Sequence, residues 1–288
     1  MPTAPIRCLF VSDLHGRTEH YKKLLLTIKD ECPAAVFLGG DLLPSHLPSV
    51  SHGFDDFIND FLVIEFELLR HTLGELYPRV FLVLGNDDVR IQETNIAAGE
   101  KRGLWEYVHN RRIPFGDYVV YGYSCIPPTP FQLKDWERYD VSRFVDPGCT
   151  HPYEGYRSIP VEERELRYAT IANDLAVLVP EKDLSNTICL FHAPPYQTHL
   201  DRAALDGQMI DSAPLDLHVG SIAIRRFIEA RQPLLTLHGH IHESPRITGS
   251  WRDRMGRTNS FSAAHDGPEL AVIQFELGNL EGATRRLI

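Results

Sequence analysis

The sequence lacks the features that mark secreted or membrane proteins. Its five cysteines show no CxxC spacing, and Cys8 and Cys189 lie within apolar runs, which is typical of small core residues in a reducing compartment. No basic segment followed by a long apolar one opens the chain, so we expect no secretory signal. No run reaches the roughly 18 apolar residues of a membrane-spanning helix. We therefore expect a cytoplasmic protein that has no membrane partner.

Positive charge is also scarce. The 29 Lys and Arg residues are outnumbered by 39 Asp and Glu, which gives a formal net charge of −10. This balance, together with the lack of a visible basic stripe, disfavours a nucleic-acid polymer as the partner. Nothing in the composition marks a domain boundary. We therefore predict a single domain over residues 1–288 and leave open whether it forms a homo-oligomer.

What the sequence does contain is a series of short apolar runs that each end in a polar turn. The first run stops at Asp13-Leu14-His15-Gly16, a pattern typical of a buried strand followed by a tight turn. Further runs of this kind cover residues 34–38, 79–84, 187–191 and 234–237. An amphipathic helix around 21–28 separates the first two runs, and strand, helix and strand in this order indicate parallel pairing. The pattern predicts an α/β fold.

Three segments depart from this pattern. Asp55 and Asp56 open a predicted long helix that has Phe57, Phe61, Ile64 and Leu68 on one face, so we predict a helical insertion around 50–76. It is interpreted as a core helix, with a lid or a subunit contact as the alternative. Residues 124–160 are rich in Pro and aromatic residues and predict an irregular excursion. Residues 243–268 show no clear element, and an alternating strand at 270–277 is predicted to close the chain.

Polar residues that can bind a cation follow five of the predicted strands. In open α/β sheets, ligands bind outside the carboxyl ends of the strands, where these side chains would meet. Carboxylate, imidazole and amide ligands without thiolate suit manganese, iron, zinc, cobalt or nickel. Seven ligands exceed the four of a tetrahedral zinc site and match two ions that share a carboxylate. The candidate ligands are Asp13, His15, Asp41, Asn86, His192, His238 and His240.

The order of these motifs resembles the calcineurin-like metallophosphoesterase superfamily. The matching pieces are Asp13-Leu14-His15-Gly16, Gly39-Gly40-Asp41, Gly85-Asn86-Asp87-Asp88, Phe191-His192-Ala193-Pro194 and Gly239-His240-Ile241-His242. The resemblance implies a four-layer αββα sandwich of two mixed sheets. It also implies a hydroxide between two metal ions that attacks phosphorus.

The resemblance also distributes roles among the residues. It implies that Asp13, His15 and His240 hold the first metal, that Asp41 bridges, and that Asn86, His192 and His238 hold the second. We further predict catalytic roles for Asp41 and Asp87 and substrate contacts for Asn86, Asp87 and His242. Asp88 is predicted to orient a ligand, as metal sites usually require.

One residue departs from the superfamily pattern. A histidine that protonates the leaving group usually follows the asparagine, whereas this chain has Asp87 there. Two nearby dications would keep Asp87 ionised, so it should be a poor general acid and should oppose a dianionic monoester more than a monoanionic diester. A phosphodiesterase is therefore favoured over a phosphomonoesterase. His52 or His199, both in predicted loops, could supply the missing acid.

Each candidate also has an ordinary structural interpretation. Asp13 could cap a helix, Asn86 could accommodate a left-handed turn beside Gly85, and His192 could be a core histidine. The presence of all five motifs in this order favours a shared metal site over these separate structural roles. We therefore predict a dinuclear metal-dependent phosphohydrolase that acts on small phosphoesters, especially diesters or esters with good leaving groups. The alternative is a metal-binding scaffold or interaction protein on the same fold that has little turnover.

Overall fold

The computed structural model describes residues 5–45 and 54–288. Its strands are β1 (Arg7–Val11), β2 (Ala35–Gly39), β3 (Arg79–Val83), β4 (Glu106–Tyr107), β5 (Arg111–Phe115), β6 (Tyr118–Tyr123), β7 (Thr187–Phe191), β8 (Met209–Ile210), β9 (Ala213–Pro214), β10 (Leu235–His238), β11 (Arg252–Met255), β12 (Thr258–Ser262), β13 (Ala271–Glu276) and β14 (Asn279–Leu287). Its α-helices are α1 (Thr18–Glu31), α2 (Val63–Leu73), α3 (Glu93–Lys101), α4 (Glu163–Tyr168), α5 (Ile171–Leu178), α6 (Ile222–Arg231) and α7 (Ser244–Thr248). Short turns of other helix types are η1 (Ile58–Leu62), η2 (Gly74–Leu76) and η3 (Arg90–Gln92).

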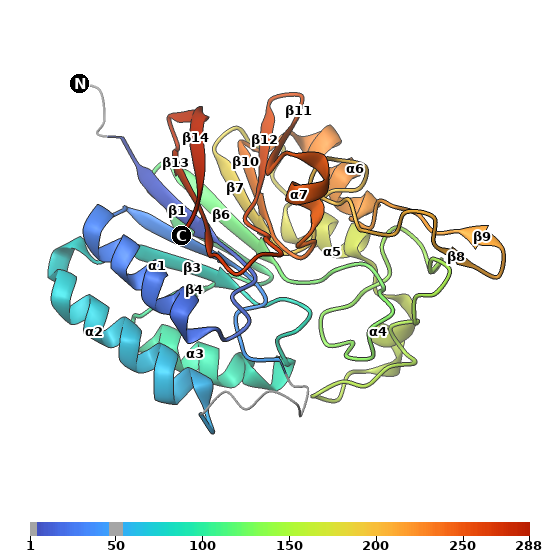
Figure 1. Cartoon of the computed structure of the whole chain (residues 1–288), viewed down its shortest axis with the longest axis horizontal. Helices are drawn as coiled ribbons and strands as arrows, with labels where there is room; N and C mark the ends of the chain where they lie inside the picture. Colours follow the sequence, from blue (N-terminus) through green and yellow to red (C-terminus); the bar gives the residue numbers. More distant parts are fainter. Residues whose placement is uncertain (1–4, 46–53) are drawn as a thin grey trace.

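Two six-stranded sheets form the centre of the molecule (Figure 1). The first sheet has the order β14-β13-β1-β2-β3-β4, and the second has the order β11-β12-β10-β7-β6-β5. In the first sheet β1 to β4 run parallel, while β13 is antiparallel to β1. In the second sheet β10 is parallel to β7 and β12, while β5 and β11 are antiparallel edges. The prediction of two mixed sheets is confirmed.

The central strands of each sheet are buried on both faces, which explains their continuous apolar runs. Phe10, Phe37 and Phe81 of the first sheet belong to one buried cluster with Leu190 and Leu237 of the second. The alternate residues of the same strands pack with the helices. Helices α1, α2 and α3 lie along the first sheet, and α5 and α6 lie along the second (Figure 1). The resulting layers are helix, sheet, sheet and helix, as the resemblance implies.

The helix after residue 54 buries a different face from the predicted one. Phe57 and Phe61 are buried as expected, but Ile64 and Leu68 are 55% and 59% exposed. The π-helical turn η1 begins the helix and adds a residue to that turn, which rotates the following positions. Val63, Phe66 and Leu69 are buried instead. The first residues of the predicted insertion, 50–53, lie outside the described residues.

The second half of the chain contains more elements than its pattern predicts. Residues 163–178 form two helices, α4 and α5, because Thr170 caps a new helix by accepting a hydrogen bond from the Asn173 N–H. Residues 243–268 contain α7, β11 and β12, and β14 follows the strand that was predicted to be the last. The sequence pattern did not predict strand β12, because small polar residues occupy its buried positions. The buried Ser260, for example, forms a 2.7 Å hydrogen bond with Thr236 of β10.

Residues 124–160, all of which the structure describes, form no helix or strand. They are nevertheless tied to the loop that follows β3. The Trp136 indole N–H donates to the Asp88 carbonyl at 2.6 Å, and the Asp135 carboxylate accepts from the Arg90 N–H at 2.8 Å. Among residues 5–45 and 54–288, no helix is long and apolar enough to cross a membrane.

Candidate metal centre

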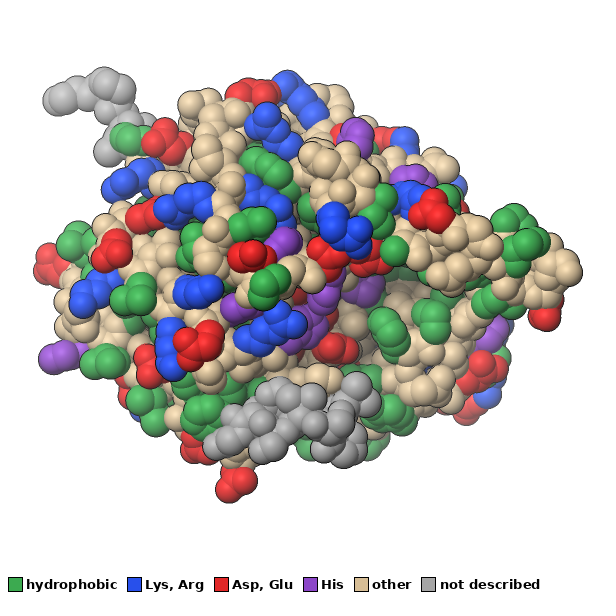
Figure 2. Space-filling view, viewed as in Figure 1, with side chains coloured by type: hydrophobic (Ala, Val, Ile, Leu, Met, Phe, Trp, Pro, Cys, Tyr) green, Lys and Arg blue, Asp and Glu red, His purple; other side chains and the backbone are tan. Residues whose placement is uncertain are grey.

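The predicted site residues follow the carboxyl ends of five strands from both sheets. In the first sheet, β1 leads to Asp13 and His15, β2 to Asp41, and β3 to the segment 86–88. In the second sheet, β7 leads to His192, and β10 leads to His240 and His242. Histidine side chains gather in the middle of one face of the molecule (Figure 2). Parallel strands therefore deliver distant segments to one place.

Four residues of these turns have left-handed backbone conformations. The φ angles are 58° at Asp13, 46° at His15, 51° at Asp41 and 74° at His240. Positive φ is unusual for residues other than glycine and costs free energy that the surrounding structure must offset. Hydrogen bonds between the turns provide part of this support, since the His15 N–H donates to the Asp41 carbonyl at 2.8 Å.

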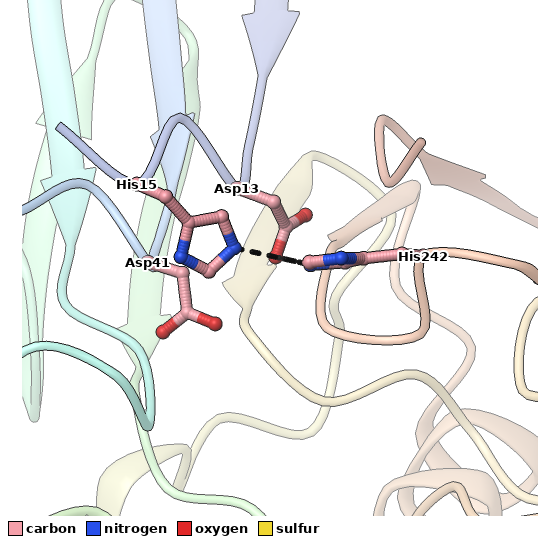
Figure 3. A group of neighbouring side chains, drawn as sticks. All are labelled: Asp13, His15, Asp41 and His242. Carbon is pink, nitrogen blue, oxygen red and sulfur yellow. Dashed lines mark hydrogen bonds and ion pairs between the residues drawn. The ribbon is translucent and has the colours of Figure 1, made fainter. Parts of the chain in front are cut away.

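The first donor group consists of Asp13, His15, Asp41 and His242 (Figure 3). One potential ligand atom from each of these residues lies within 4.8 Å of the others. The two Nε2 atoms of His15 and His242 face each other at 3.2 Å, and His242 Nε2 is 3.4 Å from Asp13 Oδ1. The His240 N–H donates to Asp13 Oδ1 at 3.0 Å and fixes that carboxylate.

The second donor group consists of Asp41, His192 and His240. His192 Nδ1 lies 2.8 Å from the Gly39 carbonyl and must donate to it, so Nε2 carries the lone pair when the imidazole is neutral. This Nε2 is 3.3 Å from Asp41 Oδ2 and 3.1 Å from Asn86 Oδ1. Three atoms that can each donate a lone pair therefore converge. Asp41 belongs to both donor groups.

This arrangement perturbs the ionisation of the side chains. Burial alone would lower the pKa values of His15 and His192, but neighbouring carboxylates raise both to about 9. Burial would raise the pKa of Asp41, but His192 and His15 hold it well below its usual range. Burial and the neighbouring His192 lower the pKa of His240 to about 3. The carboxylates and imidazoles thus stabilise each other's charge in the protein alone.

The donor set fits divalent metal ions. Carboxylate, imidazole and amide atoms converge in two groups without any thiolate, which suits borderline metals such as manganese, iron or zinc. Converging lone pairs at His192 Nε2, Asp41 and Asn86 need a proton or a cation between them. A shared carboxylate between two groups is the arrangement that two neighbouring ions require.

The structure places the three histidines at the end of β10 differently from the roles that the resemblance implied. His238 does not join either group, because its Nδ1 lies 2.8 Å from the Ala193 carbonyl and its Nε2 lies 2.7 Å from Thr236 Oγ1. His240 lies with Asp41 and His192 rather than with Asp13 and His15. His242, predicted to contact substrate, lies in the first donor group. The strand ends at His238, and the positive φ at His240 changes the chain direction. The alternation of side chains between the two faces of a strand therefore no longer predicts where His240 and His242 point.

Asp87 and Asp88 have different surroundings. Asp87 Oδ2 lies 3.3 Å from His15 Nδ1, and the Asp87 side chain is 41% exposed. Asp88 is fully buried, and its carboxylate accepts from the N–H groups of Leu42, Leu43 and Gly85 at 3.1, 2.7 and 2.9 Å. Burial and the Asp41 charge raise the pKa of Asp88 to about 7. Asp88 thus joins the loops that carry Asp41 and Asn86.

Of the two histidines considered as replacement acids, only His199 lies in the described part of the chain, and it belongs to neither donor group. His199 is 61% exposed and pairs with Asp253 at 3.0 Å. His52 lies outside the described residues.

A cavity of about 120 Å³ adjoins the first donor group. Asp13, His15 and His242 line one side of it, while Arg17 and Asp266 are among the residues of the other walls. Arg17 is exposed and makes no ion pair within residues 5–45 and 54–288. Sequence reasoning missed Arg17, although it directly follows the Asp13–Gly16 motif.

A model of the calcineurin-like phosphoesterase family matches residues 6–244 of this chain. The chain belongs to this family. The match includes every residue of both donor groups. The family assignment agrees with the metallophosphoesterase resemblance of the sequence motifs.

The individual proteins that resemble this chain are distant, and the chain matches less than a third of the length of the curated relative. Protein MJ1162 of Methanocaldococcus jannaschii is 39% identical over 79 residues, which are 27% of this chain and 30% of that relative. TT1561 of Thermus thermophilus has a crystal structure with a TM-score of 0.58 and 18% identity over 99% of both chains. A second crystal structure has a TM-score of 0.60 at 16% identity, covering 98% of this chain and 99% of that chain. At these identities the two structures support the shared fold alone.

Proposed function

We propose that this phosphoesterase hydrolyses small phosphoesters with the help of two divalent metal ions, manganese being the first to test. The observation that carries the proposal is that two donor groups share Asp41. Asp13, His15, Asp41 and His242 would hold one ion, and Asp41, Asn86, His192 and His240 would hold the other. Bound ions of this kind supply Lewis acidity that activates water and polarises phosphoryl oxygens.

The protein residues prepare this site for binding. The Gly39 carbonyl fixes the ring of His192 so that Nε2 faces Asp41 and Asn86. The Asp87 N–H donates to Asp41 Oδ1 at 2.8 Å and fixes the shared carboxylate. The adjoining cavity of about 120 Å³ is smaller than the roughly 300–1,000 Å³ of pockets for drug-sized ligands, which supports a small substrate.

We further propose a preference for diesters or for esters with good leaving groups. The carboxylate of Asp87 stands where the superfamily usually has its acid histidine, and it remains ionised beside dications. It therefore repels a dianionic monoester more than a monoanionic diester, and it cannot protonate a poor leaving group at neutral pH.

Parallel assays of nitrophenyl phosphate and bis-nitrophenyl phosphate, with and without Mn²⁺, test both statements. We expect Mn²⁺-dependent release of nitrophenol, with the larger kcat/KM for the diester. Replacement of Asp87 by His should shift the ratio toward the monoester. If the protein prefers the monoester, and Asp87→His does not change this preference, then the charge of Asp87 does not determine which ester is hydrolysed.

The second candidate function is a metal-binding scaffold that has little turnover, and the missing acid histidine favours it. Metal binding without metal-dependent release of nitrophenol from either ester would support this function. We place the protein in the cytoplasm, because all five cysteines are free, as a reducing compartment requires.

A further inference from the structure

Asp87 contacts two residues of the first donor group. Its Oδ2 atom is 3.3 Å from His15 Nδ1, and its backbone N–H donates to Asp41 Oδ1 at 2.8 Å. The backbone contact fixes Asp87 beside the shared carboxylate. Its side chain is therefore held against an imidazole of the site.

The two ring nitrogens of His15 face different groups. Nε2 lies 3.2 Å from His242 Nε2, inside the first donor group, whereas Nδ1 faces Asp87 (Figure 3 shows the His15 ring among the donors). An imidazole that gives its Nε2 lone pair to a cation carries its proton on Nδ1. That Nδ1–H would then face the Asp87 carboxylate, whose Oδ2 lies 3.3 Å away.

We infer that Asp87 is a positioning residue that fixes the ring orientation and the tautomer of His15 for metal binding. This inference rests on the proposed function, which supplies the metal ion. Histidines that bind metals usually donate their other N–H to a carboxylate or carbonyl, which makes them better ligands. His192 has such a partner in the Gly39 carbonyl at 2.8 Å, and Asp87 gives His15 the corresponding partner in the other donor group.

This role explains why an acid can occupy a position where the superfamily usually has histidine. A carboxylate can accept the Nδ1–H of His15, whereas a protonated histidine could not. The same carboxylate is then committed to His15 and is not a proton donor for the leaving group. The preference for good leaving groups and the positioning of His15 thus both follow from having Asp rather than His at position 87.

The test is a titration of metal-free protein with Mn²⁺ by calorimetry, comparing wild type with Asp87→Asn and Asp87→Glu. We expect two Mn²⁺ sites in the wild type. Asp87→Asn keeps an oxygen acceptor but loses the carboxylate charge that makes His15 a better ligand, and should weaken one of them by up to about 10–100-fold, the usual cost of changing a residue that orients a ligand. Asp87→Glu retains a carboxylate and should recover part of this affinity.

The matched control is Asp253→Asn, because Asp253 also faces a histidine, His199 at 3.0 Å, but outside both donor groups. Its Mn²⁺ affinities should equal those of the wild type. Unfolding temperatures of all metal-free variants establish that each is folded, and the partly exposed Asp87 side chain makes a folded Asp87→Asn variant the expected result.

The kcat of Asp87→Asn at saturating Mn²⁺ separates positioning from a direct contact with substrate. A positioning role predicts that saturation restores most of the turnover. Wild-type Mn²⁺ affinities in Asp87→Asn, or a loss of kcat that saturation does not restore, would overturn the inference and leave the proposed function intact. A wild-type protein that binds no Mn²⁺ would instead refute the proposed function itself.

Discussion

The first sheet brings mainly oxygen donors to the site, whereas the second sheet brings imidazoles alone. Asp13, Asp41 and Asn86 follow strands of the first sheet, and among its contributions only His15 is an imidazole. The second sheet supplies the three remaining histidines of the two donor groups, His192, His240 and His242. Each donor group contains residues of both sheets.

This difference teaches that neither sheet builds a metal site by itself. The oxygen donors carry the negative charge that attracts cations, and the imidazoles complete each set without adding further charge. Their alignment depends on the packing between the sheets, where Phe10 and Phe37 share a buried cluster with Leu190. The comparison predicts that loss of the shared Asp41 from the first sheet damages both groups, while loss of a histidine from the second sheet damages one.

The largest effect is expected for Asp41→Ala. This substitution removes the one carboxylate common to both donor groups, so Mn²⁺ binding should fall from two ions to none. Turnover should fall by more than about 100-fold, since losing a residue that only orients a ligand already costs about 10–100-fold. Calorimetry and nitrophenol release measure the two effects.

The paired variant is His242→Ala in the second sheet. It should remove one Mn²⁺ and retain the other, because His242 belongs to the first group alone. Equal losses in both variants would break the distinction between the sheets.

The next effect is expected for Gly85→Ala, where the two sheets meet. An added Cβ would lie 2.3 Å from Asp41 Oδ1 and 2.6 Å from His192 Nε2, which is too close for either contact. We expect weaker binding of both Mn²⁺ ions and a destabilisation of about 1–3 kcal/mol, as for other overpacked sites. Gly278→Ala, which has no atom within 4 Å of its added Cβ, is the control. Unchanged Mn²⁺ affinities in Gly85→Ala would contradict the close approach of the added Cβ to Asp41 and His192.

The charge pairing within the site predicts a pH dependence for metal-free protein. The pKa values of His15 and His192, about 9, lie above the value of about 6.5 in an unfolded chain. Their stabilising contribution is therefore complete below about pH 6.5 and is lost as pH rises through about 9. The unfolding temperature in a chelator should fall over this interval.

Metal binding should show the opposite trend. His15 and His192 must lose their protons to bind an ion, so the stabilisation by Mn²⁺ should grow from pH 6.5 to 9. Calorimetric scans with chelator and with Mn²⁺ measure both trends. An unfolding temperature of metal-free protein that rises over this interval would refute the pairing.

The smallest effect is expected for Arg17→Ala. Arg17 lines the cavity beside the first donor group and can contact an anionic substrate oxygen. Loss of this contact should raise KM about 10-fold with little change in Mn²⁺ affinity, since a hydrogen bond to a charged group contributes about 1.5 kcal/mol. Arg7→Ala removes another exposed arginine at the opposite end of β1 and should leave KM unchanged. Equal KM values for the two variants would exclude Arg17 from substrate binding.

The strands that carry the site were predictable because they are buried on both faces. The runs that became β1, β2, β3, β7 and β10 are continuous and apolar, and a polar turn ends each one. Strands β12 and β14 were not predictable in this way, because Ser260 and Ser262 fill buried positions of β12 and β14 is an edge strand with charged residues. The rotated face of α2 depends on the π-helical turn, which has no sequence signal of its own.

The sequence by itself determined which chemistry is available: Asp13, His15, Asp41, Asn86 and His192 each follow an apolar run within a few residues, so each stays close to the end of its strand. The tertiary structure decided which donors meet. Beyond the end of β10, alternation along a strand gives no guide, so only the folded turn shows that His240 and His242 enter the site while His238 bonds to Ala193 and Thr236. The contact between Asp87 and His15 likewise joins two turns from different strands, and it exists only because parallel pairing places those strand ends at one edge.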